Sequence, residues 1–133
     1  MKRFVLLYTL LLSLFSCSNN NRMSELSSID NMLDSLDYAS ASKALVKIGT
    51  EKLSGEQKAY YQLLKTRYAF GKNSFIDDSL SLNACIDYYK AKNMKDELAR
   101  AYFYKGEMYR LAGDMAKALS TKKNRNSYSK TVI

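Results

Sequence analysis

The segment AYFYKGEMYRLAGDMAKAL, residues Ala101–Leu119, decides the fold that this sequence predicts. Before Gly113, apolar and aromatic residues recur every three or four positions, which is the spacing of one helix face, and the pattern extends back to about Lys95. Gly113 is suited to end a helix, and Asp114 is suited to cap the next one, which keeps helical register to Leu119. The segment therefore predicts two helices joined by a very short turn.

The same helical period runs through the chain upstream of this segment. Further helices are predicted from about 24 to 36, 38 to 48, 54 to 71, and from about 77 onward. Asp37 is placed to cap the second of these, and Ser54 and Gln57 have the spacing of a capping box at the third. No segment shows sustained alternation, so the predicted class is all-α. The connections are short, and consecutive helices should pack as antiparallel hairpins.

The quoted segment resembles the tetratricopeptide repeat (TPR), a family of helix pairs that stack into solenoids. The resemblance covers about half of one repeat and rests on two aromatics, two glycines and one alanine: Tyr102, Tyr109, Gly106, Gly113 and Ala118. Lys105 departs from the family, which prefers a large aliphatic residue there, and the earlier helix pairs match only loosely. The resemblance implies antiparallel helix hairpins stacked as a short TPR-like solenoid over residues 24–119.

A binding surface follows from the resemblance rather than from the residue pattern. In TPR arrays the groove is lined by first-helix residues opposite the packing stripe. These positions carry over to Arg100, Phe103, Glu107 and Arg110. The implied partner is a protein, presented as an extended peptide or a helix. The alternative is that these are ordinary exposed residues with one surface aromatic among them.

The start of the chain has the pattern of an export signal. Lys2 and Arg3 precede an apolar run from Phe4 to Phe15, which is shorter than the roughly 20 residues that span a bilayer. An ordinary secretory signal or a buried apolar helix would share this run. However, Ser16 and Cys17 then follow in a pattern that resembles the lipobox of bacterial lipoproteins. We therefore expect residues 1–16 to be removed and Cys17 to carry the lipid.

Several acyl chains on one cysteine would hold the protein on a membrane where a single chain would not. Residues 17–23 then form a lipidated cysteine and a polar tether. Ser18 is not the aspartate that retains lipoproteins at the inner membrane, and the tether lacks the acidic cluster that marks some surface-exposed lipoproteins. The expected location is the cell envelope, at the outer membrane and facing the periplasm.

The net charge of +8 does not point to nucleic acid. Two cations leave with the predicted signal peptide, and four more lie in the last twelve residues, so the body between them carries only about +2. A nucleic-acid site would need these charges gathered on one folded face with aromatic residues among them. We therefore expect no nucleic-acid partner.

No group of residues predicts catalysis, a cofactor or a metal. Asp30, Asp34 and Asp37 share a helical face but lack calcium-loop spacing, and a solvated acidic face is the simpler interpretation. The carboxylate pairs 77–78 and 96–97 lie at helix starts, where the helix dipole favours negative charge. Cys85 lies on an apolar stripe, and the chain has no histidine to activate it. We expect a protein that is not an enzyme.

The helical pattern breaks after Leu119, in the middle of the repeat. The family has a bulky apolar residue at Lys122 and a small one at Arg125, and residues 120–133 are predicted to be a basic disordered tail.

Two hypotheses follow. One is a membrane-anchored interaction module, acting as a scaffold or as the sensory part of an envelope regulator. The other is a truncated or frameshifted remnant of a longer TPR regulator with no ligand, which the downstream nucleotide sequence would reveal.

Lipid attachment is testable at Cys17. Radiolabelled palmitate should enter the wild-type chain, and Cys17→Ser should abolish both the labelling and the retention in membranes, because Cys17 is the residue expected to carry the lipid. Cys85→Ser is the matched control and should leave both unchanged. Equal labelling of the Cys17→Ser chain would overturn the lipoprotein interpretation.

Overall fold

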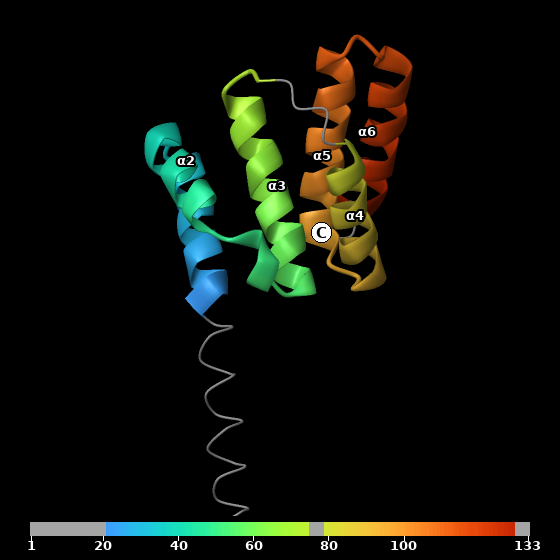
Figure 1. Ribbon diagram of the computed structural model, residues 1–133. Helices are drawn as coiled ribbons and strands as arrows, with labels where there is room; N and C mark the ends of the chain where they lie inside the picture. Colours follow the sequence, from blue (N-terminus) through green and yellow to red (C-terminus); the bar gives the residue numbers. More distant parts are fainter. Residues whose placement is uncertain (1–20, 75–78, 130–133) are drawn as a thin grey trace, which may run out of the picture.

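The computed structural model describes residues 21–74 and 79–129, and all of the regular structure in these ranges is helical (Figure 1). A helix over residues 21–34, called helix 21–34 below, precedes the other elements: α2 (Tyr38–Lys47), the short 3-10 helix η1 (Thr50–Lys52), α3 (Gly55–Gly71), α4 (Ser79–Ala91), α5 (Lys95–Leu111) and α6 (Met115–Ser129). The all-α prediction is confirmed. Within the described ranges, no helix has both the length and the apolar character needed to cross a bilayer.

Some predictions fall on residues that lie outside these ranges. They are the signal peptide at residues 1–16, the lipid attachment at Cys17 and the carboxylate pair at residues 77–78. The predicted tether over residues 17–23 needs one correction, because residues 21–23 already belong to helix 21–34. These three residues are helical because the stripe that begins at Leu26 extends back to Met23, whose side chain packs on the core.

Side-chain caps begin three of the helices, α2, α3 and α6, at the predicted places. The Asp37 carboxylate accepts a hydrogen bond from the Ser40 backbone N–H at 3.1 Å, and Asp114 accepts one from the Lys117 N–H at the same distance. Ser54 and Gln57 form the predicted reciprocal capping box, with bonds of 2.9 and 3.4 Å. Each cap satisfies backbone donors that the first turn of a helix leaves without partners.

Four of the helix ends are built in the same way. After α5, Gly113 has φ +79°, its N–H donates to the Arg110 carbonyl at 3.1 Å, and the next N–H donates to Tyr109 at 2.9 Å. This bond pair, in which the left-handed residue is the first donor and its successor is the second, is the Schellman motif. It recurs at three other residues with positive φ: Leu36, Asn73 and Asn93. Asparagine and glycine accept this conformation easily, whereas leucine does not.

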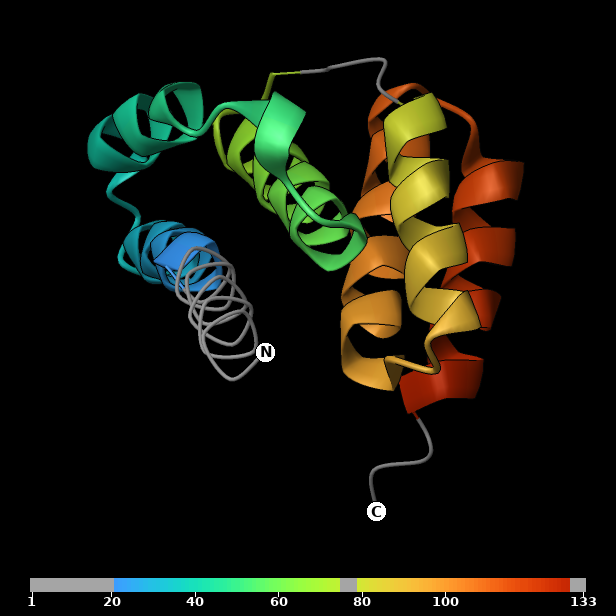
Figure 2. The same cartoon turned by 60° about the horizontal axis from the view of Figure 1, so that its bottom comes forward.

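Helix α3 separates two hydrophobic clusters. Leu64 joins the cluster formed with helix 21–34, α2 and the residues that flank η1, and its neighbour Leu63 joins the cluster formed with α4 and α5. Figure 2 shows α3 between these two groups of helices. Both leucines are fully buried. Because consecutive residues on a helix point about 100° apart, one helix can contribute to cores on two sides.

Packing beyond α3 follows the chain order. Helix α4 contacts α3 and α5, α5 also contacts α3 directly, and α6 makes its most extensive contact with α5 (Figure 1). Helix α5 therefore lies against two preceding helices at once. Gly106 of α5 faces α6, where a Cβ atom added to it would lie 3.7 Å from the Ala118 carbonyl oxygen and from Thr121.

The prediction of a disordered tail from residue 120 was wrong for residues 120–129, because α6 continues to Ser129. Thr121 is buried against Gly106, and its hydroxyl donates to the Lys117 carbonyl at 2.7 Å. One further heptad along, the Tyr128 ring stacks on Tyr102, with centroids 5.8 Å apart. The low apolar content hid this packing face, since one small residue and one ring seven positions apart are enough to seat the helix.

Leu36 is the one left-handed residue among these turns whose side chain is poorly suited to its backbone. It is also 67% exposed, so removing its side chain forfeits little burial. Leu36→Gly should therefore raise the free energy of unfolding by about 0.5–1 kcal/mol, measured by denaturant titration of the full chain in mild detergent. Val46→Gly, at an exposed position inside α2, is the control and should lower it by about 1 kcal/mol. A loss of stability with Leu36→Gly would contradict the strain that we assign to this turn.

Candidate functional site

The four predicted groove residues do not all lie in one site. Arg100 points towards helix 21–34, where its Nη2 atom lies 2.9 and 3.1 Å from the two carboxylate oxygens of Asp30. Glu107 and Arg110 form an ion pair of 2.8 Å on α5. Phe103 packs edge-on against Phe70 of α3, with centroids 6.1 Å apart. The structure thus brings three of the residues together and assigns Arg100 to a different cluster.

Phe103, Glu107 and Arg110 line a cavity of about 280 Å³ between α5 and α6. The α6 side of this cavity is formed by two exposed apolar residues, an alanine and two cations: Met115, Leu119, Ala118, Lys122 and Arg125. The Arg125 guanidinium lies over the Phe103 ring at 5.7 Å from its centroid. We call this cavity and its lining the α5–α6 groove. The α5 side contains three of the residues predicted from the sequence, whereas the α6 side was not predicted, and two of its residues, Lys122 and Arg125, lie in the predicted tail.

Arg100 belongs to a polar cluster that connects three helices. Asp30 of helix 21–34 accepts hydrogen bonds from Arg100 of α5, from the Tyr60 hydroxyl of α3 at 2.7 Å, and from Arg67 of α3. Arg67 also pairs with Asp34, one turn after Asp30. The Asp30 side chain is only 14% exposed, so its charge depends on these donors for stabilisation.

The cluster shifts the pKa of its members in opposite directions. Burial alone would raise the pKa of Asp30, but the hydrogen bonds from Arg100 and Tyr60 and the two nearby guanidinium charges outweigh it and lower the pKa. Burial and the bond to Asp30 raise the pKa of the Tyr60 hydroxyl, which stays protonated as a donor. The Asp30 side chain is therefore ionised at neutral pH and lies between two guanidiniums.

The interpretation of Asp30, Asp34 and Asp37 as a solvated acidic face needs correction. Asp30 and Asp34 are paired with arginines, and Asp37 lies outside the helix as a cap. The pairing was missed because the arginines come from helices far along the chain. One signal was present: 33 residues separate Asp34 from Arg67, and 33 more separate Arg67 from Arg100. Such spacing is close to one helix-pair repeat.

The residues of the predicted repeat signature all lie at contacts between α5 and α6 or in their turn. Tyr102 stacks on Tyr128, Gly106 faces Ala118, and Gly113 forms the left-handed turn. Tyr109 lies under the Lys117 ammonium, at 5.5 Å from ring centroid to Nζ. These contacts explain why aromatic and small residues alternate along this part of the sequence.

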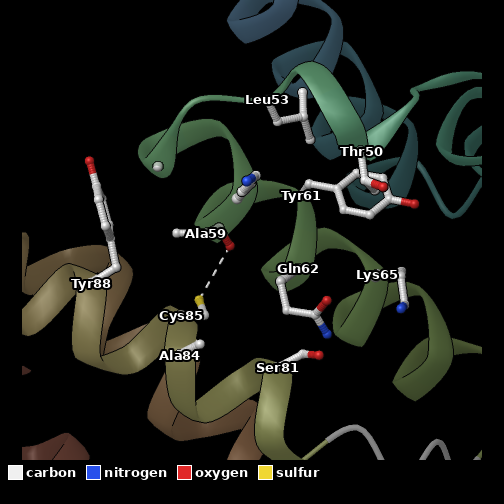
Figure 3. Close-up of a pocket in the computed structure, with 12 residues that line it drawn as sticks. Thr50, Leu53, Ala59, Tyr61, Gln62, Lys65, Ser81, Ala84, Cys85 and Tyr88 are labelled. Carbon is white, nitrogen blue, oxygen red and sulfur yellow. Dashed lines mark hydrogen bonds between the residues drawn. The ribbon is translucent and has the colours of Figure 1, made fainter.

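A second cavity, of about 500 Å³, lies between η1, α3 and α4. Figure 3 shows its residues, with the Cys85 thiol donating to the Ala59 carbonyl oxygen at 3.3 Å. Tyr61 and Tyr88 lie on either side of it (Figure 3). Burial raises the pKa of Cys85 to about 12, so the thiol stays protonated at neutral pH and is a poor nucleophile. The prediction that Cys85 is a core residue is confirmed.

The acidic pair at residues 96–97 lies in the first turn of α5, as predicted, and the N-cap residue of this helix, Met94, makes no side-chain capping hydrogen bond. Within residues 21–74 and 79–129, no three side chains of the usual ligand types are gathered closely enough to hold a metal ion.

Comparison with family models, curated proteins and solved structures found no match for this chain.

The Asp30 cluster predicts how stability depends on pH. The pKa of Asp30 is lowered in the folded state, so its carboxylate contributes to the free energy of unfolding at pH values above the unfolded-state pKa of about 3.9. This contribution is lost as the pH falls through the folded-state pKa. Asp30→Asn should lower the free energy of unfolding at pH 6 by about 2 kcal/mol. The decrease in the free energy of unfolding from pH 6 to pH 3 should then be smaller in this variant than in the wild type. Asp87→Asn, at an exposed position on α4, is the control. Parallel acid profiles for wild type and Asp30→Asn would contradict the stabilising role of the carboxylate.

Proposed function

We propose that this protein is a membrane-anchored, non-catalytic interaction module whose helices stack as TPR-like hairpins and whose partner is another protein. Cys17 would carry the lipid anchor, and the folded part would act as a scaffold or as the sensory part of an envelope regulator. The observation that carries the proposal is the α5–α6 groove, an unfilled apolar surface with charged edges. Such surfaces mark binding sites on small domains.

The order of helix contacts supports the TPR-like arrangement. Helices α3 and α4 form one pair, α5 and α6 form the next, and α5 contacts both members of the preceding pair. Each pair would then bury its apolar faces against its neighbour, which is how solenoid repeats gain stability. The contacts of Tyr102 and Gly106 with α6 agree with the roles that the resemblance assigns to them.

The chemistry of the described residues supports binding over catalysis. Cys85 is buried and protonated, and the Asp30 carboxylate is committed to two arginines and a tyrosine. These groups stabilise the packing of helices and are not presented to a substrate. The α5–α6 groove instead offers Met115 and Leu119, which are 55% and 63% exposed. Exposed apolar side chains beside cations suit the burial of a partner's surface.

The anchor would place this surface close to a membrane. Residues 17–20, which separate the proposed lipidated cysteine from helix 21–34, can span at most about 14 Å even when fully extended. A partner would therefore meet the groove within the envelope. The short reach favours partners that are themselves membrane-bound or attached to the envelope.

Photo-crosslinking in the cells that make this protein tests the proposal. A photoreactive phenylalanine analogue replaces Leu119 in the groove, or Val46 on α2 as an exposed apolar control. We expect a discrete adduct from position 119 that is absent at position 46, and we expect Cys17→Ser to reduce it by displacing the protein from the membrane. The same adducts from both positions, or none from position 119, would overturn the proposal.

A further inference from the structure

The α5–α6 groove lies between two neighbouring helices, and in this respect it resembles the surface of α3 and α4 on which α5 packs. Helix α5 lies against α3 and α4 together, and its Leu98 and Ala101 side chains are buried there. On the other side of the array, α5 and α6 form the next pair, and among the described residues no helix covers their shared groove. A pair of neighbouring helices thus presents a helix-binding surface that is free of a partner.

The apolar part of this groove is a stripe about one helical turn long on α6, with one aromatic ring opposite it on α5. Phe103 supplies the α5 side, and Met115, Ala118 and Leu119 supply the α6 side at the spacing of one helix face. Met115 and Leu119 are two of the four large hydrophobic residues in the described ranges that are more than half exposed. An amphipathic helix places side chains at matching intervals, so its apolar face can cover this stripe.

The edges of the groove carry an excess of positive charge. Arg110, Lys122 and Arg125 face it, and Glu107 is the single acidic residue in its lining. Glu107 is already paired with Arg110 at 2.8 Å, and the Arg125 guanidinium lies over Phe103. Within the described residues, Lys122 makes no ion pair. A bound segment would therefore need negative charge beside its apolar face to match this edge.

We propose that the partner of the α5–α6 groove is an amphipathic helix with acidic residues flanking its apolar stripe. This inference rests on the proposed function and names the chemistry of its partner. The apolar face of that helix covers Phe103, Met115 and Leu119, and its carboxylates lie next to Lys122 and Arg125. A second copy of this chain is a poorer occupant, because two positively charged grooves repel each other when they face one another.

A designed peptide tests the charge and the helix separately. The probe is a fluorescent 17-residue helix, equal in length to α5, with leucines along one stripe and glutamates beside it. Its binding to the full chain in mild detergent is measured by fluorescence anisotropy. Two matched peptides replace every glutamate with glutamine or with lysine. We expect the glutamine peptide to bind about tenfold more weakly than the acidic one, and the lysine peptide more weakly still. Raising the salt concentration from about 0.05 to about 0.5 M should weaken the acidic peptide most.

Variants of exposed residues locate the binding without disturbing the core. Leu119→Gln and Lys122→Glu should each weaken the acidic peptide about tenfold. Their matched controls are Val46→Gln on α2 and Lys90→Glu on α4, which make the same chemical changes at exposed positions away from the groove. These controls should bind as the wild type does. Circular dichroism of each variant checks that its helical content is unchanged.

The outcomes separate this inference from the proposed function. If the glutamine peptide binds as tightly as the acidic one and Leu119→Gln weakens both, the acidic chemistry is wrong while the groove remains a binding site. If no peptide binds, or if no groove variant weakens peptide binding, the inference is overturned. The crosslink from position 119 then tests the proposed function independently. A concentration-dependent dimer that Leu119→Gln dissociates would also overturn the inference, because the occupant would be a second copy.

Discussion

The buried carboxylate of Asp30 is the interaction on which the arrangement of the helices depends. It receives donors from two other helices, from Tyr60 and Arg67 on α3 and from Arg100 on α5. A charge that is 14% exposed is tolerated only when such partners surround it. Apolar stripes allow one helix to shift along another at modest cost, whereas this geometry is satisfied in one register only. The cluster therefore sets how helix 21–34 sits against the rest of the protein.

The same cluster determines which arginines are neutralised within the fold. Arg67 and Arg100 are the cations that face helix 21–34, and the carboxylates of Asp30 and Asp34 neutralise them internally. Arginines that are already paired gain little from an acidic ligand, since the existing bonds must first be broken. Among the residues that line the α5–α6 groove, Glu107 is the single acidic residue beside Arg110, Lys122 and Arg125. The groove lining therefore carries an excess of positive charge that the Asp30 cluster does not.

Helix α6 shows how a polar helix can pack with few apolar residues. It rests on α5 through Thr121, which fits beside Gly106, and through the stacking of Tyr128 on Tyr102. The threonine hydroxyl is satisfied within its own helix, so its burial costs little. One face of α6 packs on α5 in this way, and Met115 and Leu119 of α6 lie on the side that borders the groove. The outward face can then be basic without affecting the packing.

The sequence alone determined the helices, because caps, left-handed turn residues and the 3.6-residue period act over a few neighbouring positions. Ser54, Asp114 and Gly113 mark helix boundaries that hold whatever the helices pack against. The tertiary structure alone decided the partners of Asp30 and the course of the chain after Leu119. Asp30 and Arg100 are 70 residues apart, and the pairing of two such charges depends on how the helices between them stack. Local pattern carries no information about that distance, so the pairing of Asp30 became visible only in the folded chain.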